Sequence, residues 1–309
     1  MTGAVRRPGA LGVALAVLVV ALLPLAATTD RFLTLANGRA ILASAALVGI
    51  TAIGATLVMI AGSAVSMAAS QTATVVAMVF LWTLSHGLVV ATLFGLLAGV
   101  LITVVQGLIV GYWEANPIVL TIAAGFAIGG GSVWFSGGTP VNAGSGDYEV
   151  LNATPLGLPL AVYVLLALAV LAQWMLRRTA PGRQMYLIGE NRAAARAAGL
   201  PVGRVIALAW AFFGLCLAVT GVFLAAFNTS ATTNLAGTLT LDAIAAVLLG
   251  GTAIAGGKGS ALRTLGGAVL IAVIADVLLL RGYSTGIQIL AKGVLVLAVV
   301  VLVHLRGRR

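Results

Sequence analysis

Ten long apolar stretches, separated by short polar or glycine-rich links, dominate the chain. A helix that crosses a bilayer needs about 20 mainly apolar residues, and most of these stretches approach that length. We therefore predict an all-α fold, a polytopic transmembrane helical bundle of about ten membrane segments. The predicted segments are residues 10–27, 40–61, 65–82, 88–110, 118–135, 156–176, 205–227, 241–255, 261–280 and 287–304.

The first and eighth segments differ from a plain spanning helix. Segment 10–27 follows Arg6 and Arg7 and ends in small residues, as a signal peptide does. A polytopic chain needs no separate signal, so we expect an uncleaved helix. Segment 241–255 is short and rich in glycine, and we expect it to be broken or re-entrant. Such a segment is tolerated where protein or a water-filled cavity surrounds it.

Composition supports a membrane protein and decides how the charge is interpreted. Of the 309 residues, 61% are hydrophobic and only 8% are charged, so a soluble domain could not cover its surface. The net charge of +10 lies in links between apolar segments. This pattern indicates a positive-inside bias and not a nucleic-acid-binding surface. The single cysteine, Cys216, excludes an intrachain disulfide.

The basic residues also predict the orientation. If the N-terminus lies in the cytoplasm and the segments alternate, most of the 17 basic residues fall inside, so we expect an N-in, C-in topology. The inside then holds Arg6, Arg7, Arg177, Arg178, Arg183, Arg192, Arg196, Arg204, Lys258, Arg263, Arg306, Arg308 and Arg309.

A short helix is predicted within the cytoplasmic stretch 177–204, the longest polar link on that side. Asn191 is a suitable N-cap, residues 192–198 favour a helix, and Gly199 can supply the left-handed residue that ends it. The sequence thus specifies both ends of this helix.

The surface of this helix suggests a contact with another molecule. Arg192 and Arg196 are four residues apart and share one face, whereas Ala193, Ala194 and Ala197 keep the rest narrow. A thin helix with a basic stripe suits insertion into the cleft of a partner protein. The alternative is a helix that lies on anionic lipid headgroups.

The motifs of an enzyme are missing from the sequence. Residues 251–260 (GTAIAGGKGS) are glycine-rich, but they lack the spacing of a phosphate-binding loop. The two histidines, His86 and His304, lie at segment ends and form no pattern with Cys216. We therefore expect no catalytic activity, no cofactor and no metal in this chain.

Two charged residues lie well inside predicted segments. Asp276 is about 6 Å below the outer end of its segment and Lys292 is roughly 7–8 Å below the start of the next, which follows after a short turn. Adjacent antiparallel helices would place these charges at similar depth, so we predict a structural ion pair. The alternative partner of Asp276 is Arg281, which would leave Lys292 to reach toward the interface.

Small-residue patterns recur along the chain. Residues 62–66 (GSAVS) echo 251–255 (GTAIA), which is compatible with an internal repeat. GxxxG pairs at 95–99, 107–111 and 125–129 allow close helix approach, within the bundle or at a dimer face.

Several stretches resemble one known family. Residues 182–202 (GRQMYLIGENRAAARAAGLPV) resemble the cytoplasmic loop of ribose/galactose/xylose-type ABC importer permeases, and 241–259 (LDAIAAVLLGGTAIAGGKG) resemble another signature of that family. The resemblance covers most of the chain. Further matches are NPIVLT at 116–121, GGTP at 137–140, and FLT at 32–34 followed by Asn37.

The resemblance implies a permease subunit in a bacterial cytoplasmic membrane, with residues 1–309 as a single permease domain. It implies a second permease subunit in a homo- or heterodimer, a cytoplasmic ABC ATPase that hydrolyses ATP, an extracytoplasmic solute-binding protein, and a monosaccharide or related small polar solute. The short cytoplasmic helix would couple to the ATPase. Its coupling residues would be Gly189, Glu190, Asn191, Arg192, Ala193, Ala194, Arg196, Ala197, Gly199 and Leu200.

The outer loops would then meet the binding protein. Loops 137–155 and 228–240 are polar and turn-rich, and the first carries the acids Asp147 and Glu149, which we expect to face basic residues on the partner.

One stretch departs from the family. Where its members carry Gly-Gly-Ile-Asp-Leu-Ser-Val-Gly, residues 61–68 read AGSAVSMA, without the acid. This leaves the solute and the identity of the second subunit open. The rival hypothesis for function is a stand-alone, ion-coupled secondary transporter, but such carriers usually need several buried ionisable residues.

Overall fold

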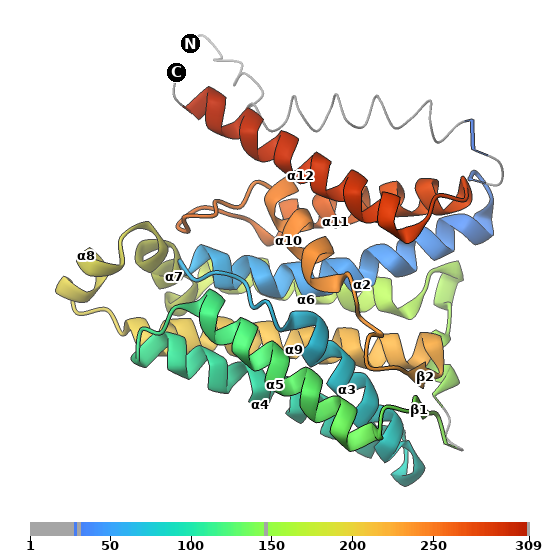
Figure 1. Ribbon diagram of the computed structural model, residues 1–309. Coiled ribbons are helices and arrows are strands. Elements are labelled where there is room, and N and C mark those ends of the chain that lie inside the picture. The colour runs from blue at the N-terminus through green and yellow to red at the C-terminus, as the bar shows by residue number, and fades with distance from the viewer. Residues whose placement is uncertain (1–27, 30–31, 145–147, 308–309) are drawn as a thin grey trace.

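The computed structural model describes residues 28–29, 32–144 and 148–307 of the chain. Within these residues the protein is a helical bundle with one small two-stranded sheet (Figure 1). The α-helices are α2 (Leu35–Ile60), α3 (Ala69–Thr83), α4 (Leu88–Tyr112), α5 (Pro117–Ser136), α6 (Leu160–Arg178), α7 (Ala180–Glu190), α8 (Arg192–Ala197), α9 (Val202–Asn228), α10 (Leu239–Leu249), α11 (Ala261–Leu280) and α12 (Thr285–Gly307). The strands are β1 (Val141–Asn142) and β2 (Ser230–Ala231), and the short 3-10 helices are η1 (Leu84–His86), η2 (Glu149–Asn152) and η3 (Pro155–Gly157).

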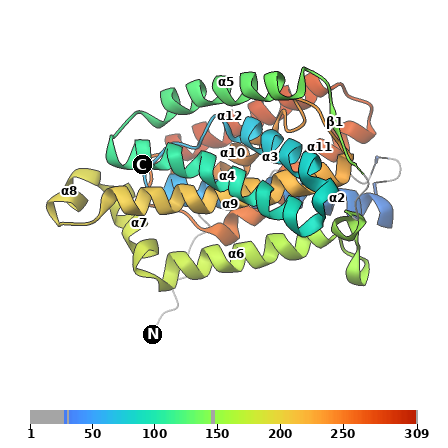
Figure 2. The same cartoon turned by 90° about the horizontal axis from the view of Figure 1, so that it is seen from below.

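The long helices run side by side, so the bundle has two ends (Figures 1 and 2). Helix α8 projects from one of them, which we call the α8 end, and the two strands lie at the other, which we call the strand end. Helices α2 and α9 are central: α9 packs against α4, α2 and α3, and α2 packs against α11, α6 and α10.

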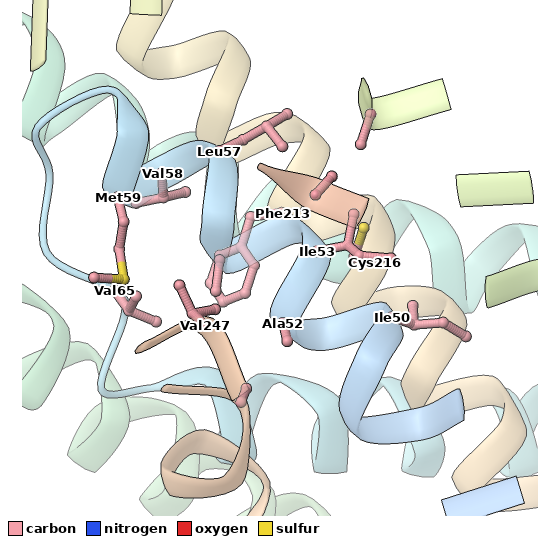
Figure 3. Packing of buried hydrophobic residues seen from close by; sticks show 14 of the residues in the cluster. Ile50, Ala52, Ile53, Leu57, Val58, Met59, Val65, Phe213, Cys216 and Val247 are labelled. Atoms are coloured by element: carbon pink, nitrogen blue, oxygen red, sulfur yellow. The ribbon is translucent and has the colours of Figure 1, made fainter. Parts of the chain in front are cut away.

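The main core forms along α2, which is buried from Ala45 to Ile60 except for Leu47. Figure 3 shows Phe213 and Cys216 of α9 beside the side chains of α2. Because lipid tails are as apolar as leucine, close packing and not water exclusion holds such helices together. Threonine pairs add direct links, with the hydroxyls of Thr56 and Thr264 2.8 Å apart between α2 and α11.

Small residues let α4 approach α9 closely. A Cβ added to Gly99 would lie 2.8 Å from the Cβ of Ala218, and one added to Gly107 would collide with Trp210. The predicted GxxxG pairs on α4 therefore serve packing inside this chain.

Two loops at the α8 end have the same hydrogen-bond pattern. After α2, Gly62 N donates to Met59 O at 2.9 Å; after α10, Gly251 N donates to Leu248 O at 2.9 Å. Both glycines have φ near +75°, a left-handed conformation that favours glycine. The echo between 62–66 and 251–255 thus corresponds to two similar helix ends.

The predicted fold class is confirmed in its main features. Six of the described helices are long and apolar enough to cross a membrane, namely α2, α4, α5, α6, α9 and α11. The eighth segment is short as predicted, because α10 has only 11 residues. Segment 10–27 lies outside the described residues. Segment 65–82 begins later than predicted, since α3 starts at Ala69.

Helix α7 was not predicted. Its N-cap is Thr179, whose hydroxyl accepts a hydrogen bond from Gly182 N at 3.2 Å, and Pro181 lies in the first turn. A threonine cap followed by proline is a recognisable start of a helix, so the sequence held the signal.

Candidate functional site

The α8 helix forms with both of its predicted ends. The Asn191 side chain accepts a hydrogen bond from Ala194 N at 3.0 Å and caps the N-terminus. At the other end Gly199 has φ +75°, and Leu200 N donates to Ala195 O at 3.0 Å. These bonds satisfy the backbone groups that so short a helix would otherwise leave unpaired.

The arginine stripe of α8 bonds to its own chain, although Arg196 stays exposed. The Arg192 guanidinium donates to Val110 O at 3.1 Å, near the end of α4, and Arg196 forms an ion pair with Glu114 in the α4–α5 link. The hydrogen bond from Arg196 holds the pKa of Glu114 below its usual range. The stripe thus fastens α8 to the end of α4.

Glu114 is a residue that our interpretation of the sequence missed. It has φ +54°, a conformation that is uncommon for a side chain other than glycine or asparagine. Glu114 is an acidic residue in a short link on the side where the basic residues gather, and this position could have indicated an ion pair.

Helix α8 also presents alanine to its surroundings. Ala193, Ala194 and Ala197 are exposed, whereas Ala195 is buried against the bundle. The projecting surface is therefore narrow, with these alanines beside the exposed, ion-paired Arg196.

The base of α8 is held by closely packed backbones. Gly257 N donates to Ile60 O at 3.0 Å, which joins the loop after α10 to the end of α2. Gly189, two residues before the cap, lies against both: an added Cβ would collide with Ile60 O and lie 2.5 Å from Gly257 N. A Cβ on Gly62 would lie 2.9 Å from Gly189 Cα. We call Gly62, Gly189 and Gly257 the glycine junction.

At the strand end the two loops 137–155 and 228–240 lie together, because β1 pairs antiparallel with β2. Glu149 begins η2 and is exposed. Asp147 lies outside the described residues. The sequence did not predict the pairing of these loops.

The predicted Asp276–Lys292 pair is wrong. Lys292 Nζ lies 2.7 Å from Asp242 Oδ1 of α10, and Asp276 Oδ2 accepts a hydrogen bond from Asn37 Nδ2 at 2.8 Å. The short turn makes α11 and α12 neighbours, but α12 also packs against α10, and Lys292 is on the face toward α10. The Thr238 hydroxyl donates to the second oxygen of Asp242 at 2.9 Å.

A bundle in which six of the described helices can cross a membrane is the architecture of a multi-pass membrane protein. The chain belongs to the family described as "Branched-chain amino acid transport system / permease component", which matches residues 39–304. It is thus a permease subunit of a bacterial membrane and is not itself an enzyme.

Several relatives carry specific names. The chain is 30% identical over 284 residues to "Ribose import permease protein RbsC" of Escherichia coli K12, covering 88% of this chain and 87% of the relative. It is 32% identical over 288 residues to "Probable ABC transporter permease protein YphD" of the same strain, covering 93% and 87%. It is 32% identical over 213 residues to "Autoinducer 2 import system permease protein LsrD" of Yersinia enterocolitica, covering 67% and 64%. No solved structure matches the chain significantly.

Proposed function

We propose that this chain is one of two permease subunits in an ATP-driven importer for a small, neutral, polar solute such as a monosaccharide. Relatives named for the import of ribose and of autoinducer 2 support this substrate class. A cytoplasmic ABC ATPase would supply the energy, and an extracytoplasmic binding protein would deliver the solute. The whole chain, 1–309, acts as a single permease domain.

The orientation follows from charge. We place the α8 end in the cytoplasm, with an N-in, C-in topology of about ten segments. Basic residues gather at that end, and the positive-inside bias places such residues on the cytoplasmic side of the membrane. These basic residues lie at the end of α6, in α7 and α8, near the start of α9, just before α11 and in its first turn, namely Arg177, Arg178, Arg183, Arg192, Arg196, Arg204, Lys258 and Arg263.

The observation that carries the proposal is α8 itself. It projects beyond the bundle, and its exposed surface includes three alanines. It is fastened through Arg192 to α4 and through Arg196 to the α4–α5 link. Gly189, just before it, lies against the end of α2 and the loop after α10. A partner that holds this face can therefore move three helix ends at once. We assign residues 189–200 as the surface that seats in a cleft of the ATPase.

Copurification of the ATPase with the permease tests this assignment. Ala194→Trp and Ala197→Trp should insert into the membrane but lose the ATPase, because a large ring cannot enter a cleft shaped for alanine. Ala153→Trp, the same change at an exposed alanine near the strand end, is the matched control and should retain it. Normal copurification and uptake in both α8 variants would refute the coupling role.

At the strand end, we assign the paired loops 137–155 and 228–240 to the docking surface for the binding protein. Their pairing through β1 and β2 and the exposed carboxylate of Glu149 support this role. Asp147 would extend the same acidic surface.

A further inference from the structure

Two helices of the bundle begin in its interior instead of at an end. Helix α10 runs from Leu239 to Leu249. The next residue, Gly250, lies against Thr264, which bonds to Thr56 about one turn before the end of α2. Thr240 therefore lies about 14 Å further into the bundle along the α10 axis. Ser70, in the first turn of α3, contacts Thr240 there. Because α2, with 26 residues, is about 39 Å long, the two helix starts meet near the middle of the bundle.

The two helix starts bond to each other reciprocally. Ser70 N donates to Thr240 Oγ1 at 2.9 Å, and Thr240 N donates to Ser70 Oγ at 3.0 Å. Irregular backbone at this depth occurs only inside protein or beside a water-filled cavity. Transporters commonly place the solute where such half-helices begin.

A second observation points to a ligand at the start of α3. Gln106 of α4 is only 4% exposed; its Oε1 accepts a hydrogen bond from Ser66 Oγ at 3.0 Å, but its Nε2 has no partner among the described residues. Ser66 Oγ accepts from Ala68 N, the residue before α3, so the free amide lies at that helix start. Buried polar groups are normally paired, and an unpaired one calls for an explanation.

A third group faces the neighbouring helix. Gln71, next to Ser70, has a buried Oε1 without a partner among the described residues. A Cβ added to Gly125 of α5 would lie 3.8 Å from this oxygen, so the side chain points between α3 and α5.

A cleft of about 310 Å³ lies between α3, α4 and α5, and its lining residues Val75 and Ile102 are each four positions from one of the two glutamines. Val75 and Val79, which line it, lie one and two turns beyond Gln71 on the same face of α3. Ser132 of α5 also lines it, and none of the described lining residues is charged. Ligand clefts are commonly apolar with a few placed polar groups, and this one has that character.

We propose that the cleft between α3 and α5, with Gln71 and Gln106 each one helical turn from its lining, is a binding subsite for a neutral polyhydroxylated solute; this deepens the proposed function and rests on it. A hydroxyl group both donates and accepts, so one hydroxyl or two neighbouring ones match the free amide donor of Gln106 and the free oxygen acceptor of Gln71. An amino acid fits poorly, because no carboxylate of the lining meets its ammonium group.

Cysteine labelling of the whole transporter in proteoliposomes tests the subsite. In a Cys216→Ala background, Gln71→Cys and Val75→Cys should react with a small charged methanethiosulfonate, because the cleft holds water. Phe126→Cys, on the outward face of α5, is the control for lipid exposure. Its reaction should be at least about tenfold slower, since an apolar environment that raises a thiol pKa by one unit lowers the thiolate fraction about tenfold.

Protection by candidate solutes tests the chemistry. With the binding protein present, D-ribose, D-xylose and D-galactose are the polyol probes and L-leucine is the charged one. At least one sugar should slow the labelling of Val75→Cys, and leucine should not. Adding Gln106→Leu should weaken that protection about tenfold, whereas Gln288→Leu, a glutamine of α12 far along the chain, should leave it unchanged.

Labelling of Gln71→Cys and Val75→Cys no faster than that of Phe126→Cys would overturn the subsite. So would labelling that no sugar slows, or that leucine slows equally. The proposed function is tested by a different experiment. An ATPase that still copurifies with the α8 tryptophan variants would refute coupling, whereas the labelling pattern tests only the cleft.

Discussion

The ion pair between Asp242 and Lys292 gives the sharpest quantitative prediction. It joins α10 to α12, and both side chains are shielded, with 9% of Asp242 and 13% of Lys292 exposed. Lys292 is seven residues beyond Thr285, the start of α12, or about 10 Å along the helix axis. We therefore expect Asp242→Asn and Lys292→Met each to leave one uncompensated charge within the membrane.

The magnitude follows from depth. A lone charge at the bilayer centre costs about 2.5–3.5 kcal/mol on insertion scales and less toward the interface. At this depth we expect each single change to lower the free energy of unfolding by about 2 kcal/mol. The double variant carries neither charge, so its loss should be smaller than the sum of the single losses by at least about 1 kcal/mol.

Reversible unfolding in mixed micelles, driven by increasing SDS and followed by tryptophan fluorescence, measures these differences. A second cycle, Asp276→Asn with Lys292→Met, is the matched control. Because Asp276 bonds to Asn37 and not to Lys292, that cycle should be additive within about 0.5 kcal/mol. Additive losses in the Asp242 cycle, or coupling only in the Asp276 cycle, would refute the pairing.

Three further predictions concern the two ends of the bundle. Glu114→Gln should uncouple uptake from ATP hydrolysis several-fold without releasing the ATPase, because it removes the ion pair that ties Arg196 to the α4–α5 link. Glu149→Gln should weaken the association of the binding protein and flatten its salt dependence, because rim charges act mainly through long-range attraction. Gly189→Ala should lower the amount of folded protein, because its Cβ collides with Ile60 O.

Each of these has an observable that contradicts it. Transport per ATP equal to wild type in Glu114→Gln would show that the ion pair plays no part in coupling. An unchanged salt slope in Glu149→Gln would remove that carboxylate from the docking surface. Wild-type yield of Gly189→Ala, beside a normal Gly266→Ala control at a glycine with open space around it, would show that the glycine junction tolerates a side chain.

Local sequence signals predicted the α8 helix well, because its caps depend on residues close in the chain. Asn191 and Gly199 each act through backbone groups within a few positions, so the sequence contains the whole interaction. The contacts of the Arg192 and Arg196 side chains were not predictable in this way. Their partners, Val110 and Glu114, lie about 80 residues away in the chain.

For the charged residues inside the membrane segments, too, the sequence predicted their positions, but tertiary packing decided their partners. Depth along a helix can be counted from a sequence, and the presence of a buried cation at position 292 was predicted correctly. Its partner was not, because a short turn makes two helices adjacent but does not decide which face of α12 meets which neighbour. Packing of α12 against both α10 and α11 brought Asp242 to it.

The sequence by itself determined that the chain is a polytopic membrane protein, where most of its helices lie, and which link carries the capped helix α8. Apolar length, charge asymmetry and helix caps are properties of contiguous residues, and the lipid environment acts on them directly. Only the tertiary structure decided the glycine junction, the pairing of the two loops at the strand end, and the meeting of Ser70 with Thr240. Each of these three contacts joins residues that are tens to nearly two hundred positions apart in the chain. Such contacts depend on how helices pack against one another, and the spacing of apolar residues along the sequence does not determine that packing.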